Sequence, residues 1–424
     1  MKGQFKGVQA RIKELQPLAL YVHCYNHSLN LAIRDAMKNL PAAREALQWV
    51  HDVGVIISRS PKGHARFEEL REEIDESLRA GACKQCVTRW TVRVRSLDGT
   101  LNCYHSVLSF LDELAGQKAV EESGDGQKVN ISAKARGIHD QLEKCQVYFT
   151  LLVLRDLFEP CEALSKVLQS PTFCMAGANE AVDLTLKNLK RMRSDEHFEL
   201  LWSKMEQAKE KYELVEPSLP RKRRSPLDAH NRGTAYHFQS IKDSMRRDYF
   251  EIIDVAANEI ESRFQQEDFK TLMTLESALL TPPNKWDDVD GLEDVLKEYG
   301  FNVPKLKGNV QSLPDIAPGK TTVRGAADAF AALQDETRKL FFELEKLIIL
   351  LLVLPVSAAT AERSFSALRR LKNYLRTCTG QDRLNHMAIL HIYKERVDNL
   401  DVNKIMKTFV NNETRHRIFG KVDF

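Results

Sequence analysis

The sequence predicts a mainly α-helical protein with a small α/β part. Apolar residues recur at helical spacing through most of residues 91–341, which indicates helices that bury one face. A short β-prone segment, ALYVH at residues 19–23, is the candidate buried strand and supplies the α/β part. The chain has 424 residues, which is enough for two or three domains.

Composition is typical of a soluble globular protein, with 43% hydrophobic and 29% charged residues. The net charge is only +3, so any contact with nucleic acid requires a local basic patch. The apolar run at residues 346–356 is shorter than the ~20 residues that span a bilayer, and no signal peptide is expected. Eight scattered cysteines predict free thiols in an intracellular protein.

The N-terminal region combines short helices with the candidate strand. Val8, Ile12 and Leu15 form a helical stripe that Pro17 ends. After the strand, Asn26 is the expected cap of a helix through residues 28–33. Residues 41–60 are amphipathic, and the next helix starts at Ser60 and Pro61.

Two pairs of residues have the spacing of zinc ligands and form one candidate metal site: Cys24, His27, Cys83 and Cys86. The pairs lie far apart in the sequence, so the alternative is a half-buried cysteine with a locally hydrogen-bonded histidine. Trp90 is a candidate buried anchor at the start of a helix.

The middle of the chain reads as successive helices. We expect an apolar-periodic stretch over residues 138–168, interrupted near Pro160, and another helix over residues 176–214. Residues 216–231 form a proline-rich linker, and helices resume at residue 237. The linker carries a basic run that indicates a nuclear import signal, a phosphate contact or a solvated charge run: Arg221, Lys222, Arg223 and Arg224.

The C-terminal region opens with the apolar run at residues 347–354, closed by Pro355. A helix follows, with Ser357 or Thr360 as its cap and Glu362 in its first turn, where the helix dipole favours a carboxylate. One face of this helix is apolar: Ala361, Phe365, Leu368, Leu371 and Leu375.

A second C-terminal helix, around residues 387–393, is apolar nearly all round and must be buried on more than one side. We expect one side, with Leu384, Met387 and Leu390, to pack on the core. The other side, with Ile389, Ile392 and Tyr393, has no evident cover. A second chain, the middle of the chain or the amphipathic helix at residues 402–410 are the candidates to cover it.

Two blocks of this sequence resemble hAT-superfamily transposases. The first is the Pro-x-Ser…Ala-Glu-Arg-Ser-Phe-Ser block with the Arg-Leu-Asn…Ala-Ile-Leu-His segment that follows it, which is similar to the hAT dimerisation region. The second is Gly-x-x-x-Gly-Val-Gln with Cys-x-x-His-x-Leu-Asn-Leu, at residues 3–33. It resembles the branch that contains zinc-finger MYM-type proteins and the repressor of the inhibitor of the interferon-induced protein kinase.

The resemblance implies an incomplete RNase H-like domain interrupted by a large all-α insertion. Residues 1–100 and 341–424 would form the RNase H-like domain, and residues 101–340 the insertion. The dimerisation residues would be Phe365, Leu384, Met387, Ile389, Leu390, Ile392 and Tyr393. The resemblance also makes Trp90 a candidate for base stacking.

The resemblance also implies that Glu362 is the third acid of a catalytic D-D-E triad. The other two acids of the family lie upstream of the segment that Met1 begins, so we expect a catalytically inactive dimerisation module. The alternative is a fragment of an active DNA transposase. We expect a homodimer or a related hAT-derived partner, with DNA as a further candidate, in the nucleus or otherwise in the cytoplasm. No cofactor, small-molecule substrate or membrane is expected.

Overall fold

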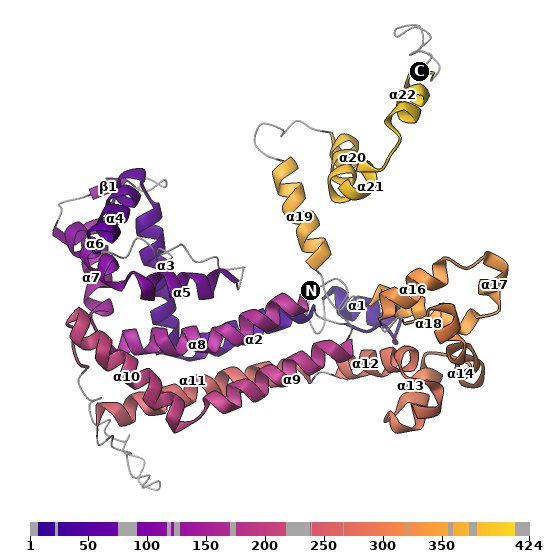
Figure 1. Cartoon of the computed structure of the whole chain (residues 1–424), viewed down its shortest axis with the longest axis horizontal. Helices are drawn as coiled ribbons and strands as arrows, with labels where there is room; N and C mark the ends of the chain where they lie inside the picture. The colour runs from indigo at the N-terminus through magenta and orange to yellow at the C-terminus, as the bar shows by residue number, and fades with distance from the viewer. Residues whose placement is uncertain are drawn as a thin grey trace. The chain divides into compact units, whose positions relative to one another are not determined.

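The structure is a computed structural model, and helices dominate it (Figure 1). It separates into two compact units, Met1–Ser357 (unit 1) and Ala358–Phe424 (unit 2). The prediction of a mainly α protein is confirmed. The structure describes residues 7–21, 24–74, 91–116, 120–122, 128–169, 175–217, 238, 240–265, 267–319, 322–354, 359–372 and 380–411.

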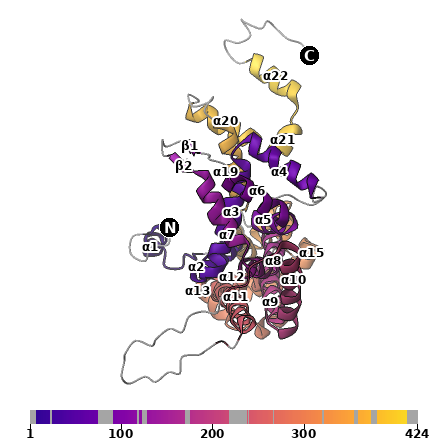
Figure 2. The same ribbon diagram turned by 90° about the vertical axis from the view of Figure 1, so that its left-hand side faces the viewer.

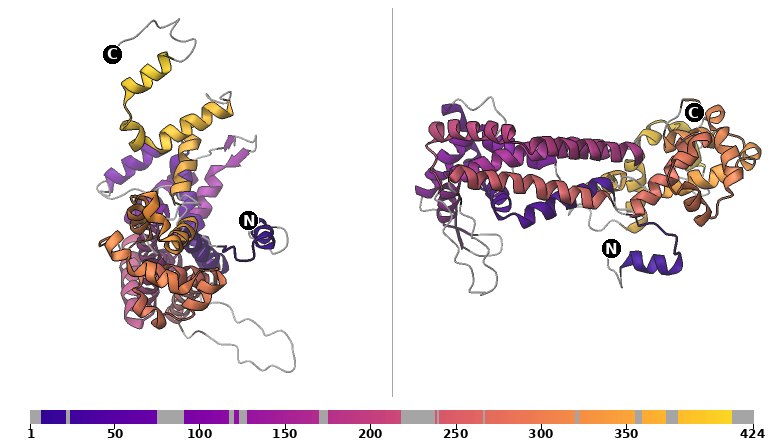
Figure 3. Two further views of the ribbon diagram at one scale, coloured as in Figure 1. Left: turned by 90° about the vertical axis from the view of Figure 1, so that its right-hand side faces the viewer. Right: turned by 90° about the horizontal axis from the view of Figure 1, so that it is seen from below.

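Four long helices pack side by side in the middle of unit 1 (Figures 1 and 3). They form because apolar residues repeat at helical spacing, as Leu151, Leu154 and Phe158 do, and all three are buried. The four helices are α2 (Tyr25–Asn39), α8 (Cys145–Leu168), α9 (Met175–Met192) and α11 (Ile241–Phe264). A fifth helix, α10 (Asp195–Tyr212), packs on α8.

Shorter elements pack at the two ends of this bundle. A short antiparallel hairpin adjoins one group of helices, and its strands lie near α7 (Figure 2). The first group is α3 (Pro41–Ser58), α4 (Pro61–Glu73), α5 (Thr91–Asn102), α6 (Tyr104–Gly116), β1 (Val120–Glu122), β2 (Lys128–Asn130) and α7 (Ile131–Leu142). The second is α12 (Glu267–Leu280), η1 (Pro283–Asp288), α13 (Leu292–Glu298), α14 (Val303–Gln311), α15 (Leu313–Ile316), α16 (Val323–Ala331), α17 (Asp335–Lys339) and α18 (Phe342–Val353).

The N-terminal helix α1 (Val8–Leu15) forms where the sequence predicts it. Its apolar stripe is exposed, with Leu15 88% accessible. Unit 2 consists of α19 (Ala359–Leu371), α20 (Gln381–Ile392), α21 (Lys394–Asp398) and α22 (Val402–Val410). Across its described residues, Leu384 and Val410 are the buried hydrophobic side chains, so the described part of the unit has a very small core.

Side-chain caps set several helix boundaries. The Ser60 hydroxyl accepts a hydrogen bond from the Gly63 backbone N–H at 3.0 Å, and α4 begins there as predicted. Ser194 accepts one from the His197 N–H at 3.2 Å and starts α10. The single helix predicted over residues 176–214 is therefore wrong, because this cap divides it into α9 and α10.

The predicted strand at residues 19–23 is not observed. Residues 19–21 adopt no regular structure, and residues 22 and 23 lie outside the described part of the chain. A strand is stable only when its backbone pairs with a neighbour. Here the Leu18 carbonyl instead accepts a hydrogen bond from the Tyr299 hydroxyl at 2.9 Å. The hairpin is the sheet present in the described residues, so the predicted α/β part is not seen.

Two local predictions in the long helices are also corrected. Asn26 does not cap α2 but lies within it, where its Oδ1 accepts a hydrogen bond from the Ser165 hydroxyl at 2.6 Å. Pro160 does not interrupt α8, which continues through it. A proline removes one helical hydrogen bond, and the buried neighbours Phe158 and Cys161 hold the helix against the bundle.

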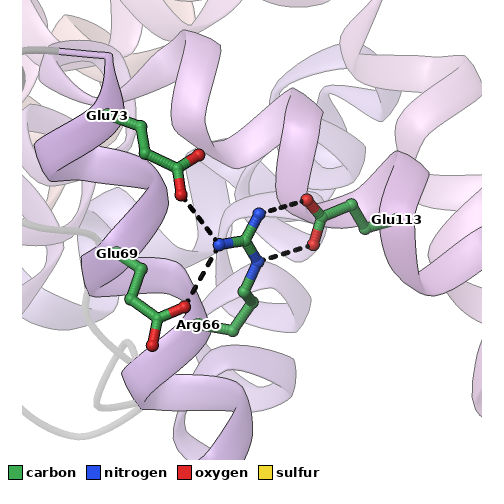
Figure 4. A network of polar contacts seen from close by, with 4 residues as sticks. All are labelled: Arg66, Glu69, Glu73 and Glu113. Atoms are coloured by element: carbon green, nitrogen blue, oxygen red, sulfur yellow. Dashed lines mark hydrogen bonds and ion pairs between the residues drawn. The ribbon is translucent and has the colours of Figure 1, made fainter.

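Arg66 ties α4 to α6 through a network of carboxylates (Figure 4). Its Nε and Nη2 donate to the two carboxylate oxygens of Glu113 at 3.0 and 2.7 Å. Its Nη1 donates to Glu69 and Glu73 at 3.1 and 3.0 Å. The hydrogen bonds from Arg66 lower the pKa of Glu113 below its usual 4.5.

We expect Glu113→Gln to lower the thermal midpoint of unit 1 at pH 7 by on the order of 1–2 °C, because the pair is half exposed. A lowered carboxyl pKa stabilises the fold above the unfolded pKa, and this contribution is lost as the pH falls through the folded pKa. The gap from wild type should therefore be smaller at pH 3 than at pH 7 in thermal melts followed by circular dichroism. Glu72→Gln, an exposed change on α4, is the control. A gap of equal size at both pH values would contradict the argument.

Candidate functional site

The exposed apolar face of α20 is the main candidate site. Ile389 is 54% exposed, Ile392 42% and Tyr393 51%, and their helical spacing places them on one side of the helix. Leu384, on the opposite side, is 6% exposed. The sequence predicted this division, with Leu384 inward and the other three outward. We call the side formed by Ile389, Leu390, Ile392 and Tyr393 the α20 face.

Leu390 was expected to pack with Leu384 and Met387, but it is 52% exposed. Met387 is partly buried, as expected. The reason is the rotation of α20 about its own axis. The helix α20 contacts α19, Leu384 is its buried residue, and successive residues of a helix are rotated by about 100°. Leu390 therefore lies at the edge of the α20 face and enlarges it.

The helix α22 carries a second apolar side, as the sequence predicted. Val402 is 64% exposed, Ile405 50%, Met406 39% and Phe409 49%, and their spacing defines one stripe along the helix. The Asp401 carboxylate caps α22 by accepting from the Asn403 and Lys404 N–H groups at 3.0 and 3.2 Å. The stripe is exposed and does not cover the α20 face.

The helix α19 presents a basic surface and one prominent aromatic side chain. Phe365 is 70% exposed, and Arg369, Arg370 and Lys372 are exposed as well. Because α19 begins at Ala359, Thr360 lies within the helix and cannot be its cap. Glu362 falls in the first turn as predicted, although its side chain lies outside the described structure. Ser357 and Leu375 also lie outside the described residues.

In unit 1, α18 buries one side and exposes the other. Leu344, Leu347, Ile348 and Leu351 are buried against unit 1, whereas Ile349, Leu352 and Val353 are 55%, 44% and 67% exposed. The apolar run at residues 347–354 is thus a helix that is covered on one side.

One family model matches the part of the chain that contains α18, α19 and α20. Residues 333–395 match the model of the hAT family C-terminal dimerisation region. The match covers α17, α18, α19, α20 and the first residues of α21, and it supports a hAT-derived protein. The α20 face lies within the hAT dimerisation region, whereas α22 lies beyond it.

The other predicted site residues are only partly described. Cys24 precedes α2 and is partly buried, and His27 is exposed in the first turn of that helix. Their proposed partners Cys83 and Cys86 lie outside the described residues, as do Trp90 and the basic run Arg221, Lys222, Arg223 and Arg224. The zinc, stacking and import predictions on these residues stay predictions.

The acidic residues of the N-terminal helices have structural roles. Asp35 on α2 pairs with Arg263 on α11 at 2.5 Å, and Asp52 on α3 pairs with Lys134 at 3.0 Å. Elsewhere in the described residues, His139, Asp140 and Glu143 are close enough to hold a metal ion. His139 Nδ1 lies 3.5 Å from Glu143 on the surface of unit 1. This is the spacing of an ordinary pair at positions i and i+4.

An open groove of about 770 Å³, which the sequence analysis did not identify, runs along α11 near Arg193. The guanidinium groups of Arg193 and Arg246 lie over the ring of Phe250, 4.8 and 5.6 Å from its centroid. Arg193 is paired with Asp254 and Arg246 with Asp195. Because carboxylates match these charges, the groove is nearly neutral and has little to attract a phosphate. The spacing of Arg246 and Phe250 on one helix was the signal in the sequence.

In the part of the chain that the structure describes, no helix has the length and apolar character required to cross a bilayer.

Proposed function

We propose that this chain is a dimerisation module of a hAT-derived protein and that the α20 face binds a second copy of the chain. The exposure of Ile389, Leu390, Ile392 and Tyr393 carries the proposal, because contiguous exposed apolar residues mark interaction sites. The match to the hAT dimerisation region gives the kind of partner. The RNase H-like ancestry and the zinc-finger MYM-type branch, which the resemblance implies, are part of this proposal.

The small core of unit 2 supports the same proposal. A small domain buries a smaller fraction of its surface than a large one, and its stability is correspondingly marginal. Unit 2 spans 358–424, and few of its described apolar side chains are buried. A second copy would supply the missing apolar contacts.

The direct test is the mass of the wild-type chain in solution. We expect light scattering at micromolar concentration to give about twice the 48.5 kDa of one chain. The mass should fall toward one chain on dilution, because a reversible dimer dissociates once the concentration of the chain falls below its Kd. A mass of one chain at every concentration would end the proposal.

We further propose that these 424 residues do not cleave or join DNA. Two-metal catalysis requires several carboxylates that converge on metals ~4 Å apart. Glu362 is the position of this sequence that matches the family triad, and Asp35 and Asp52 are held in ion pairs on other helices.

We expect no strand cleavage or joining of terminal-inverted-repeat DNA with Mg²⁺ or Mn²⁺, and no difference between wild type and Glu362→Gln. The measurement is the formation of cleaved or joined DNA, followed on gels. Activity that Glu362→Gln abolishes would instead favour the alternative, a fragment of an active transposase.

A further inference from the structure

Three side chains that can ligate a metal ion meet at the C-terminal end of α7. They are His139, Asp140 and Glu143, and one ligand atom from each lies within 4.8 Å of the other two. Any helix brings positions i and i+4 together, so His139 and Glu143 alone would be an ordinary pair. Asp140 adds a third ligand. At about 100° per residue, Glu143 lies between the other two on the helix surface, so one ion is within reach of all three.

The distance between His139 and Glu143 fits a shared ion better than a hydrogen bond. His139 Nδ1 lies 3.5 Å from a carboxylate oxygen of Glu143, whereas an N–H···O hydrogen bond is about 2.7–3.2 Å long. Two ligands that bind one Zn²⁺ at about 2.0–2.2 Å in tetrahedral geometry are roughly 3.4 Å apart. The nitrogen and the oxygen therefore already have the spacing of neighbouring ligands. Asp140 is exposed, so its side chain can rotate to complete the set.

The two carboxylates of this cluster carry negative charge that no lysine or arginine offsets in the described part of the chain. Glu143 pairs there with His139, and Asp140 has no ion pair. The basic residues nearest in sequence donate to other groups: Lys134 to Asp52, Arg136 to the Ala115 carbonyl and Lys144 to Gln141. The C-terminal end of a helix also carries a partial negative charge. Both effects favour a cation at this position.

The backbone around the cluster is fixed by hydrogen bonds to other parts of unit 1. The Tyr104 hydroxyl donates to the Leu142 carbonyl at 2.6 Å. The Val215 N–H donates to the Glu143 carbonyl at 2.7 Å, and the Glu143 N–H donates to the His139 carbonyl at 3.0 Å. An ion would therefore be bound by small side-chain movements on a fixed backbone, and preorganised ligands lose less conformational entropy on binding.

We propose that His139, Asp140 and Glu143 form a divalent-cation site and that Zn²⁺ is the ion it prefers. Zn²⁺ accepts imidazole nitrogen together with carboxylate oxygen, whereas Mg²⁺ and Ca²⁺ favour oxygen ligands. Three protein ligands leave the fourth tetrahedral position to water. Because Glu143 lies between α7 and α8, a bound ion fixes the junction of these two helices. The site is independent of the proposed dimerisation, because it lies in unit 1 and the α20 face lies in unit 2.

Isothermal titration calorimetry of the full chain with zinc chloride tests the site. We expect His139→Ala, Asp140→Asn and Glu143→Gln each to weaken one binding event at least ~100-fold, because losing a residue that only orients a ligand already costs about 10–100-fold. Twelve histidines and eight cysteines offer zinc other positions, so the informative signal is the event that these variants remove. His64→Ala and Asp112→Asn, exposed changes on α4 and α6, are the matched controls and should bind zinc as wild type does.

Thermal melts followed by circular dichroism give a second measurement. Zinc should raise the midpoint of unit 1 in wild type, because a ligand that binds the folded state stabilises it, and Asp140→Asn should reduce this rise. Without zinc, this exposed change should leave the spectrum and the midpoint as in wild type, which excludes misfolding as the cause.

Three results would overturn the site. One is a wild-type chain that shows neither zinc-dependent heat nor a shift of the midpoint. Another is zinc binding that all three variants retain with the affinity of wild type, which would assign the ion to other residues. The third is a loss in His139→Ala and Glu143→Gln but none in Asp140→Asn, which would leave a pair of ligands in place of the proposed three. None of these results affects the proposed dimerisation.

Discussion

Ile389→Asp is expected to convert the dimer into a soluble monomer. Ile389 is 54% exposed at the centre of the α20 face, so an aspartate at this position is well solvated in a single copy. In the dimer the same carboxylate would be buried without a partner, which costs several kcal/mol. A loss of about 3–4 kcal/mol weakens association by two to three orders of magnitude. The light-scattering mass at micromolar concentration should therefore fall to that of one chain.

The same variant also shows whether the α20 face is an interface between copies or part of the core of one copy. If the α20 face were covered within one copy, Ile389→Asp would unfold part of the chain and its helical circular dichroism would decrease. We expect the spectrum and melting of unit 1 to stay as in wild type. Ile392→Asp should reproduce the result, since it lies one turn along the same face. A dimeric Ile389→Asp protein would show that another surface holds the two copies together.

Tyr104→Ala is expected to lower the free energy of unfolding of unit 1 by about 3–5 kcal/mol. Tyr104 is fully buried at 0% exposure. Its ring centroid lies 4.8 Å from that of Tyr148 in an edge-on contact and 5.4 Å from that of Tyr212. Its hydroxyl donates to the Leu142 carbonyl at 2.6 Å. Leu142 is the last residue of α7, where helix carbonyls have no partner within the helix.

Tyr104→Phe separates the contribution of the hydroxyl hydrogen bond from that of the ring contacts. It keeps the ring contacts but leaves the buried Leu142 carbonyl without its donor, which costs about 1–3 kcal/mol. Urea unfolding followed by tyrosine fluorescence and circular dichroism should rank wild type above Tyr104→Phe, and Tyr104→Phe above Tyr104→Ala. Equal losses in the two variants would assign the whole effect to the hydrogen bond. Neither variant should change the mass of the dimer in its folded state.

The sequence was sufficient for features that depend on local pattern. Helical spacing located α11 and the extent of α8, although the predicted stretch at residues 138–168 also included the last turn of α7. The caps at Ser60 and Ser194 were readable, although only Ser60 was used. The helix apolar on all sides around Ile389 predicted a surface without cover, and the structure shows that surface exposed. A pattern in one segment determines which residues can face outward together.

Features that depend on distant neighbours were not predictable. Whether residues 19–21 pair as a strand depends on another strand, and in the described structure the Ala19 N–H donates to the Gln16 carbonyl in a turn instead. Pro160 stays within α8 because the bundle packs around it. Leu390 faces outward because α20 buries Leu384, and the sequence of one helix does not determine the rotation at which it packs. The stacking of Arg193 on Phe250 joins residues that a single sequence gives no reason to connect.

The very small core in the described part of unit 2 has a consequence for how such a protein behaves in a cell. If folding of this unit depends on the partner, mass action links its folded fraction to the concentration of the chain. A copy that finds no partner presents the apolar residues of the α20 face to chaperones and proteases, whereas a paired copy hides them. Single copies would then be degraded and dimers retained, because only single copies expose these apolar residues.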